Sequence, residues 1–238
     1  MQISRPSPGA IPSTTAELLT ALGSSSRPAI TYYAVGPDET EDPARVELSG
    51  KVLAQWAVKS ANLFYEEGLE PGDIVVLDIP PSWRAVPWAL GAWLQGCSIT
   101  IIPHDDASAV VTTRPERASG DVVIAVTEDP LALRFERDLP PGVLDGVADV
   151  AGQADFALQP ALREPLRIAV ADAGIRFIDL HEVIGVGPEG RSLIVPTTVW
   201  DLIRRSVAAW RAGGSVVVVD ERLPLETRSR AAAQEGAV

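Results

Sequence analysis

The chain has 238 residues, 46% of them hydrophobic and 22% charged, which is typical of one globular domain or two small lobes. Its net charge of -12 disfavours nucleic acids and anionic membranes as partners, because both are negatively charged. The single cysteine excludes an internal disulfide and a cysteine-rich zinc site, and a polar start without any apolar run of about 20 residues favours the cytoplasm.

The first predicted elements are a short helix, a strand and a longer helix. We expect residues 1–14 to be a flexible arm and residues 16–22 to be helical, followed by a strand at 30–34. Ser49 is a candidate N-cap of a strong helix whose apolar residues recur at helical spacing until Gly68. This pattern predicts one buried stripe along the longer helix.

A βαβ unit is predicted next. Residues 74–79 are apolar except for Asp78, which is typical of a strand buried on both faces of a parallel sheet. A helix is expected at 83–95 and a second buried strand at 98–102. A strand, helix and strand of these lengths form a right-handed crossover.

A similar unit is predicted near the C-terminus. We expect a strand at 191–195, a helix at 199–211 and a second strand at 216–220. With an offset of 117 residues, Trp93 matches Trp210 and Gly96 matches Gly213. Two interpretations stay open: weak internal symmetry between two similar lobes, or the general likeness of any two buried βαβ units.

The middle of the chain is predicted less completely. Residues 121–127 form a predicted strand, whereas 128–186 give no consistent pattern. The fold class is therefore α/β, with two βαβ-containing lobes and largely parallel sheets, one lobe at 15–119 and the other at 120–226. The Ala-rich end at 227–238 is expected to be a flexible tail.

Two segments carry a series of motifs in a fixed order. The first runs from Val46 to Pro103 and includes Glu47-Leu48-Ser49, Ala61-Asn62-Leu63, Pro71-Gly72-Asp73, Leu90-Gly91-Ala92-Trp93 and Gln95-Gly96-Cys97. The second runs from Gly187 to Asp220, where Pro196 ends a strand and Ala212-Gly213-Gly214 closes a helix. In these residues the chain resembles the adenylate-forming enzymes, the superfamily of acyl-CoA synthetases, amino-acid adenylation domains and luciferases.

The resemblance implies the N-terminal part of an adenylate-forming domain without its C-terminal lid, in a short actinobacterial family related to AMP-dependent synthetases. Such enzymes hold ATP with a Ser/Thr/Gly-rich loop that ends in lysine, between the two matched segments. The lysines of this chain, Lys51 and Lys59, both precede that region. We therefore expect no catalytic residue and no metal, and no motif supports ATP or AMP as a cofactor.

Other motifs are weaker candidates for a site. Gly185 to Gly190 match G-x-G-x-x-G, but they precede a strand, so a glycine-rich turn is favoured over a dinucleotide site. His104-Asp105-Asp106 favours a solvated acidic turn over a metal site. His181 is expected to be a surface histidine, and Cys97 a packed core thiol.

Trp200 is the candidate for lining an apolar pocket, because the resemblance places the residues after Pro196 beside an acyl site. The alternative is that Trp200, like the other tryptophans, packs in the core. The leading functional hypothesis is a non-catalytic homologue that binds a small molecule or a protein partner. Two alternatives stay open: an AMP-forming acid–thiol ligase with an unusual or trans-completed active site, and a structural or dimerising protein. Homo-oligomerisation is left open.

Overall fold

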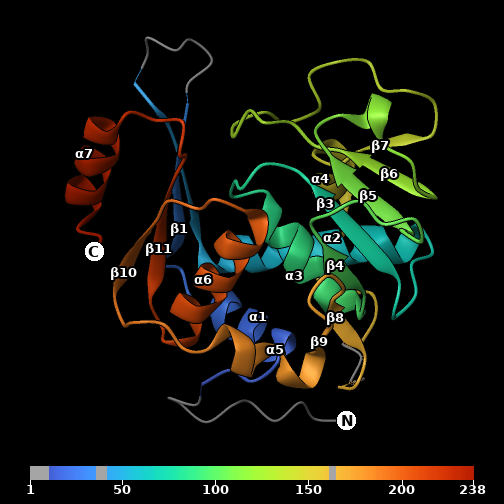
Figure 1. Ribbon diagram of the computed structural model, residues 1–238, viewed down its shortest axis with the longest axis horizontal. Helices are drawn as coiled ribbons and strands as arrows, with labels where there is room; N and C mark the ends of the chain where they lie inside the picture. Colours follow the sequence, from blue (N-terminus) through green and yellow to red (C-terminus); the bar gives the residue numbers. More distant parts are fainter. Residues whose placement is uncertain (1–10, 36–41, 161–164) are drawn as a thin grey trace.

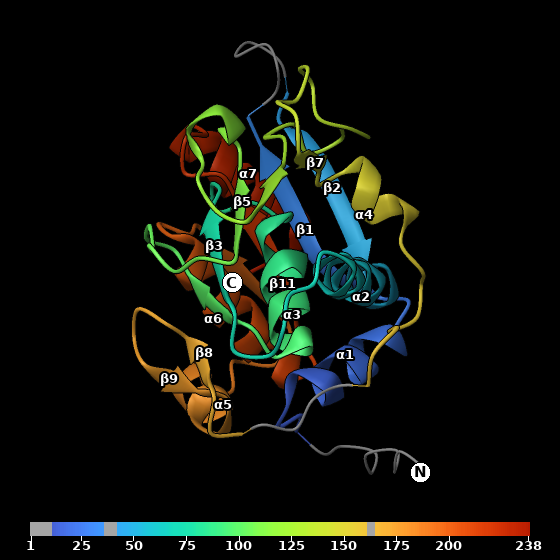
Figure 2. The same ribbon diagram turned by 90° about the vertical axis from the view of Figure 1, so that its right-hand side faces the viewer.

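The computed structural model describes residues 11–35, 42–160 and 165–238. Two sheets enclose a layer of helices (Figures 1 and 2). Sheet A has the order β10-β11-β1-β2. Its strands are β1 (Pro28–Ala34), β2 (Ala44–Ser49), β10 (Arg191–Ile194) and β11 (Ser215–Val219). Only the β1–β2 pair of this sheet is antiparallel in the described part of the chain.

Sheet B has the order β7-β6-β5-β3-β4-β8-β9. Its strands are β3 (Ile74–Asp78), β4 (Ser98–Thr100), β5 (Ala109–Thr112), β6 (Val122–Ala125), β7 (Val143–Asp145), β8 (Ile168–Val170) and β9 (Ile175–Arg176). All neighbours are parallel except β8 and β9. The predicted fold class, an α/β protein with largely parallel sheets, is confirmed.

The helical layer holds α1 (Thr15–Gly23), α2 (Gly50–Glu66), α3 (Ala85–Gln95) and α6 (Val199–Arg211). Buried side chains from these helices and from the inner faces of both sheets form one continuous apolar cluster. Ser49 caps α2 as predicted, because its hydroxyl accepts from the backbone N–H of Val52. Gly96 ends α3 with φ +84°, a conformation that residues with a Cβ rarely adopt.

Both predicted βαβ units are present, as β3–α3–β4 and β10–α6–β11. Each pair of strands is parallel and adjacent. The indole Nε1–H of Trp93 donates to the carbonyl of Ala169 at 2.9 Å, and that of Trp210 donates to the carbonyl of Ala29 at 2.8 Å. The two matched tryptophans therefore make the same type of bond, each to the strand beyond the second strand of its own unit.

The expected division at residues 119 and 120 falls between β5 and β6, which are hydrogen-bonded neighbours in sheet B. Each sheet draws strands from both 15–119 and 120–226, so the two sequence ranges do not correspond to the two sheets. The sequence predicted local units well, but which strands pair across long separations is set by tertiary packing.

Residues 227–238, expected to be a flexible tail, instead include most of α7 (Leu225–Glu235) and pack on the outer face of sheet A. The Glu235 carboxylate accepts hydrogen bonds from Tyr33 Oη at 2.7 Å and Arg45 Nε at 2.9 Å, and it forms an ion pair with Arg191 Nη2 at 2.8 Å. Val238 pairs with β10 through two backbone hydrogen bonds. Of the expected flexible arm at 1–14, the structure describes only residues 11–14, and residues 1–10 lie outside the described residues.

The remaining helices lie at the ends of sheet B. They are η1 (Pro115–Arg117), α4 (Ala148–Gly152) and α5 (Phe177–Ile184). The segment after α4 is clamped to α2 by Asn62, whose amide nitrogen donates to the carbonyls of Ala154 and Phe156 and whose oxygen accepts from Leu158 N. None of the described helices is long and apolar enough to cross a bilayer.

Candidate functional site

The order of sheet B creates a crevice between β3 and β5. After β3 the chain enters α3 on the inner face and returns at β4, on one side of β3. After β5 it crosses the outer face, where Ala118 packs near Val76 and Val110, and returns as β6 on the other side. The two connections leave in opposite directions, which is the topological switch point where α/β sheets bind ligands, outside the carboxyl ends of the strands.

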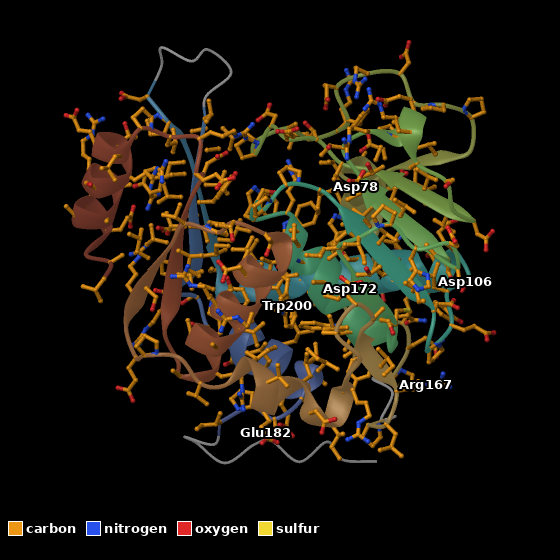
Figure 3. All side chains as sticks on the ribbon, in the orientation of Figure 1. Asp78, Asp106, Arg167, Asp172, Glu182 and Trp200 are labelled. Atoms are coloured by element: carbon orange, nitrogen blue, oxygen red, sulfur yellow. The ribbon has the colours of Figure 1, made fainter. Side chains whose placement is uncertain are left out.

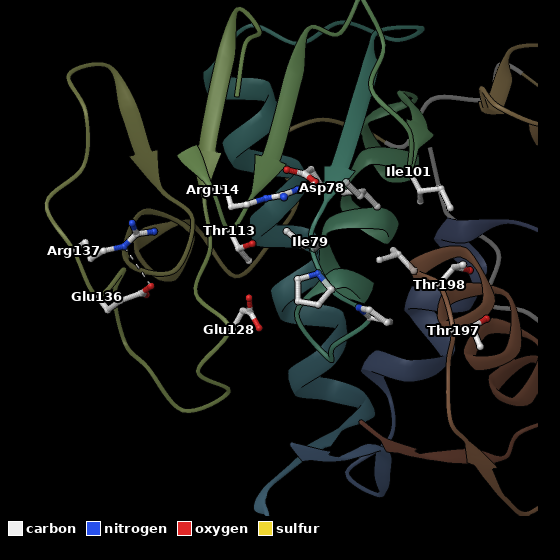
Figure 4. Close-up of a pocket in the computed structure, with 14 residues that line it drawn as sticks. Asp78, Ile79, Ile101, Thr113, Arg114, Glu128, Glu136, Arg137, Thr197 and Thr198 are labelled. Atoms are coloured by element: carbon white, nitrogen blue, oxygen red, sulfur yellow. Dashed lines mark hydrogen bonds and ion pairs between the residues drawn. The ribbon is translucent and has the colours of Figure 1, made fainter. Parts of the chain in front are cut away.

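A cleft of about 720 Å³ lies at this switch point. One wall is formed by the residues that end β3 and β5 and by the connection after β6 (Figure 4). The opposite wall is the start of α6, with Thr197 and Thr198. Its apolar lining residues are Leu77, Ile79, Pro80, Pro81, Ile101 and Val199. The cleft thus combines an apolar lining with polar groups at strand and helix ends.

An ion pair marks the junction of β3 and β5. Asp78 Oδ1 lies 2.7 Å from Arg114 Nη2, and Asp78 Oδ2 accepts from Thr112 Oγ1 at 2.7 Å. The Asp78 and Arg114 side chains are 41% and 54% exposed, so the pair contributes little to stability and both groups are accessible to a ligand.

The connection after β6 is held over the cleft by the start of α3. Trp83 Nε1 donates to the carbonyl of Pro130 at 3.2 Å, and Arg84 Nη2 donates to that of Ala132 at 2.8 Å. Burial lowers the pKa of Arg84 to about 10, and the Arg84 guanidinium stacks 4.6 Å from the centre of the Trp83 ring. These contacts fix the backbone that carries Glu128.

A second set of ion pairs links the carboxyl end of sheet A to that of sheet B. Arg222, which follows β11, lies 3.4 Å from Glu128 of the sheet B side and 2.7 Å from Asp220. Burial alone would raise the pKa of Asp220, but hydrogen bonds from Arg222 and Tyr32 lower it below its usual value. Asp220 is therefore ionised at neutral pH and keeps Arg222 beside the cleft.

The start of α6 offers a weaker positive charge. Thr198 caps the helix by accepting from the backbone N–H of Asp201 at 3.0 Å. A helix N-terminus carries a partial positive charge, but the carboxylate of Asp201 in the first turn offsets it.

The described lining of the cleft carries no excess of positive charge that could hold a triphosphate. The lining includes the carboxylates of Asp78, Glu128 and Glu136 against the guanidiniums of Arg114 and Arg137. Fixed carboxylates would repel phosphate groups, whereas phosphate sites present backbone N–H groups and cations.

Trp200 packs inside the helical layer (Figure 3). Its ring centre lies 6.4 Å from that of Trp93 in an edge-to-face arrangement. The neighbouring residue, Val199, lines the cleft, whereas Trp200 is absent from the described residues that do so. Pocket lining by Trp200 therefore remains a prediction.

The histidine and cysteine candidates occupy different environments. Cys97 is fully buried as expected, and burial raises the pKa of its thiol to about 12, which disfavours the thiolate at neutral pH. The expectation of a surface histidine at position 181 is wrong, because His181 is only 7% exposed. It lies on α5 beside Arg211 of α6, and burial, with a smaller contribution from Arg211, lowers its pKa to about 4.

The remaining motifs lie in turns. His104 and the aspartates after it follow β4, and no group of three or more metal-ligating side chains occurs among the described residues. Gly187 lies in the connection between α5 and β10, where a Cβ would come within 2.9 Å of Ala209 N. Gly187 therefore allows this connection to approach α6 closely.

Sequence reasoning missed Thr113, Arg114 and Glu128. Thr113 and Arg114 follow β5, a four-residue strand that was not predicted. The available signal was Ala109-Val110-Val111-Thr112, a short apolar run directly before a polar pair.

No protein-family model matches the chain. A protein of Mycobacterium tuberculosis, whose name gives a family without an activity, is 26% identical, and the match covers 87% of this chain and 89% of that protein. The two proteins are therefore of similar length.

Solved structures with a similar arrangement include ligases. An acyl-CoA synthetase of Brucella canis has a TM-score of 0.68 at 18% identity, over 89% of this chain and 44% of that one. A benzoate CoA ligase of Burkholderia xenovorans has a TM-score of 0.65 at 13% identity, over 91% of this chain and 47% of that one. The chain spans about half the length of these enzymes. It has the fold of the N-terminal part of the adenylate-forming ligases, which confirms the resemblance found in the sequence.

Proposed function

We propose that the chain is a non-catalytic relative of the adenylate-forming ligases that binds a small organic molecule in the cleft between β3, β5 and α6. The observation that carries this proposal is the position of the cleft at the switch point of sheet B, together with its apolar lining. We also propose a cytoplasmic location, in line with the acidic composition and the single, buried thiol.

Among the described residues that line the cleft there is no lysine. A carboxylate-activating site must stabilise negative charge that builds on the α-phosphate. Lys59 lies on α2, where its ammonium group donates to the carbonyl of Ala151 at 2.9 Å and pairs with Asp155 at 3.1 Å. These structural contacts hold the end of α4, which supports binding without chemistry.

The expected ligand has an apolar body and a single polar head. The lining around Ile79 and Ile101 suits an apolar body, and Arg114 with Thr113 suits a carboxylate or amide head. The names of the structural neighbours, an acyl-CoA synthetase and a benzoate CoA ligase, suggest benzoate and short acyl carboxylates as the first compounds for a test.

The first experiment combines two measurements on the purified chain. Thermal unfolding is followed with ATP, AMP, acyl-CoA, benzoate and a panel of short carboxylates. A ligand at 100 times its dissociation constant adds roughly 2.7 kcal/mol to the free energy of unfolding. We expect a carboxylate to stabilise the chain, ATP to leave it unchanged, and ATP–pyrophosphate exchange to be absent. Exchange by the chain alone would show that it is an enzyme.

A matched pair of variants locates the ligand. Arg114→Met removes the guanidinium at the cleft, whereas Arg134→Met removes an exposed guanidinium outside its lining. We expect Arg114→Met to abolish the ligand-induced shift and Arg134→Met to keep it. Equal shifts in both variants, or no shift of the original chain with the whole panel, would reject binding in the cleft and favour a structural role.

A further inference from the structure

The outer faces of the two sheets differ in how they are covered. The outer face of sheet A packs against α7, with Ala231 buried near Val217 and Val219. Over β3 and β5, the outer face of sheet B has only a small apolar cluster formed by Val76, Ala107 and Val110, with Ala118 beside it. In the described part of the chain, this second face is bordered by loops and the one-turn helix η1 rather than by a long helix such as α7.

These loops leave a groove of about 560 Å³ on the outer face, which we call the outer groove. Its apolar floor is formed by Val76 and Val110, which are only 4% and 6% exposed, and by the partly exposed Ala118. The connection after β4 forms one rim and the residues between η1 and β6 form the other. An apolar strip of sheet bordered by polar loops is typical of a surface that receives a partner side chain.

The rim of the outer groove is negatively charged. Asp105, Asp106 and Asp121 are exposed there, against one guanidinium, that of Arg117. Asp78, at the inner end of the groove, is already paired with Arg114. The acidic turn is held in place, because His104 Nδ1 accepts from the backbone N–H of Asp106 at 3.2 Å.

We propose that the outer groove docks a basic segment of a partner protein. An apolar side chain of the segment covers Val76 and Val110, and lysine or arginine side chains on either side approach Asp105, Asp106 and Asp121. The chain's net charge of -12 favours such a partner and opposes the approach of a second copy. Because the rim is exposed to solvent, salt weakens the interaction and slows its formation.

The experiment is a peptide-display selection on the immobilised full chain, with a library of random 12-residue peptides as the probe. We expect enriched peptides to carry lysine or arginine on both sides of an apolar residue. One enriched peptide is then synthesised, and its dissociation constant is measured by fluorescence polarisation at 50 and 500 mM salt. We expect binding to weaken at least tenfold at the higher salt concentration.

Two triple variants with the same change of charge separate the groove from the overall charge. The first, Asp105→Asn, Asp106→Asn and Asp121→Asn, neutralises the rim. The second, Glu182→Gln, Glu189→Gln and Glu226→Gln, neutralises exposed carboxylates elsewhere on the chain (Glu182 and Asp106 are labelled in Figure 3). We expect at least tenfold weaker peptide binding in the first variant and less than twofold in the second, with thermal unfolding showing that both are folded.

A third variant, Ala118→Trp, fills the groove without changing the charge and is expected to weaken binding at least tenfold. Four outcomes would overturn the proposal. They are no enrichment, enrichment without basic residues, equal weakening in the two triple variants, and competition by spermidine alone at the affinity of the peptide. A concentration-dependent dimer, lost in the rim variant, would show that the groove binds a second copy instead.

Discussion

The two βαβ units share one local plan but lie in different surroundings. In both, a helix ends at a glycine with positive φ, +84° at Gly96 and +75° at Gly213, before a buried strand. The helix α3 is buried around almost its whole circumference, whereas α6 has a solvent-exposed side that carries Arg204. The comparison shows that equivalent positions of α3 and α6 can require side chains of different size, because the element packed against each helix sets the space available.

The largest difference is expected where α2 crosses α3. A Cβ at Gly91 would come within 2.9 Å of the carbonyl oxygen of Ala57 and 2.7 Å of the Ser60 Cβ. Gly91→Ala should therefore lower the free energy of unfolding by more than about 3 kcal/mol, because backbone cannot move aside. At the matched position in α6, Ala208→Gly should cost only about 1 kcal/mol of helix propensity.

Urea unfolding measures both of these changes. Gly152→Ala is the control, since a Cβ there meets nothing within 4 Å. If Gly91→Ala destabilised the chain no more than Gly152→Ala, the close crossing of α2 and α3 would be refuted.

The second unit has an acid-sensitive neighbour. The pKa of His181 is about 4 in the folded chain and about 6.5 when unfolded, because burial disfavours the charged ring. The unfolded chain therefore binds a proton that the folded chain does not, and stability falls as the pH drops from 6.5 to 4, by about 3 kcal/mol.

Thermal or urea unfolding between pH 4 and 7 tests this expectation. The variant His181→Phe keeps a buried ring but cannot take up a proton, so it should lose less stability over this pH range than the original chain. Identical pH dependence in the two chains would contradict the assignment.

The matched tryptophans should respond alike. Trp93→Phe and Trp210→Phe each remove an indole N–H and leave a buried carbonyl, of Ala169 or Ala29, without its donor. Each change should cost about 2 kcal/mol of unfolding free energy. A cost at only one of the two positions, in urea unfolding, would break the equivalence of the units.

The smallest effects are expected at the glycines that end the two helices. Gly213→Ala should cost about 1 kcal/mol, since a Cβ there meets nothing within 4 Å and only the positive φ is strained. Gly96→Ala should cost more, because its Cβ would also lie 3.1 Å from Pro71 Cβ. Equal losses of stability in Gly96→Ala and Gly213→Ala, measured by thermal unfolding, would show that Pro71 moves aside without cost.

Features that depend on residues close together in the sequence were predicted correctly, whereas features that depend on distant residues were not. Ser49, Gly96 and the helix at 199–211 were predicted because caps and apolar periodicity are local signals. The pairing of β5 with β6, and the docking of α7, depend on residues far apart in the sequence. In the sequence, the Ala-rich segment of α7 shows no apolar face and is typical of a flexible tail. In the structure, Ala231 is buried against sheet A.

The candidate site was the least predictable part. The cleft combines Asp78, Arg114 and Thr198 from three separate elements, and no local sequence motif predicts that they lie close together. The burial of His181 was missed for a related reason, since the packing of α5 against α6 that buries it joins residues far apart in the sequence.

The position of Asp78 has a thermodynamic consequence. Among the described residues, its side chain is the one common to the cleft and the outer groove. If the cleft binds a carboxylate that draws Arg114 toward itself, as proposed above, Asp78 loses its cationic partner, and its charge would then strengthen the hold on a cation in the outer groove. Under these two proposals, linkage would make the effect reciprocal, and each ligand would raise the affinity for the other by the same factor.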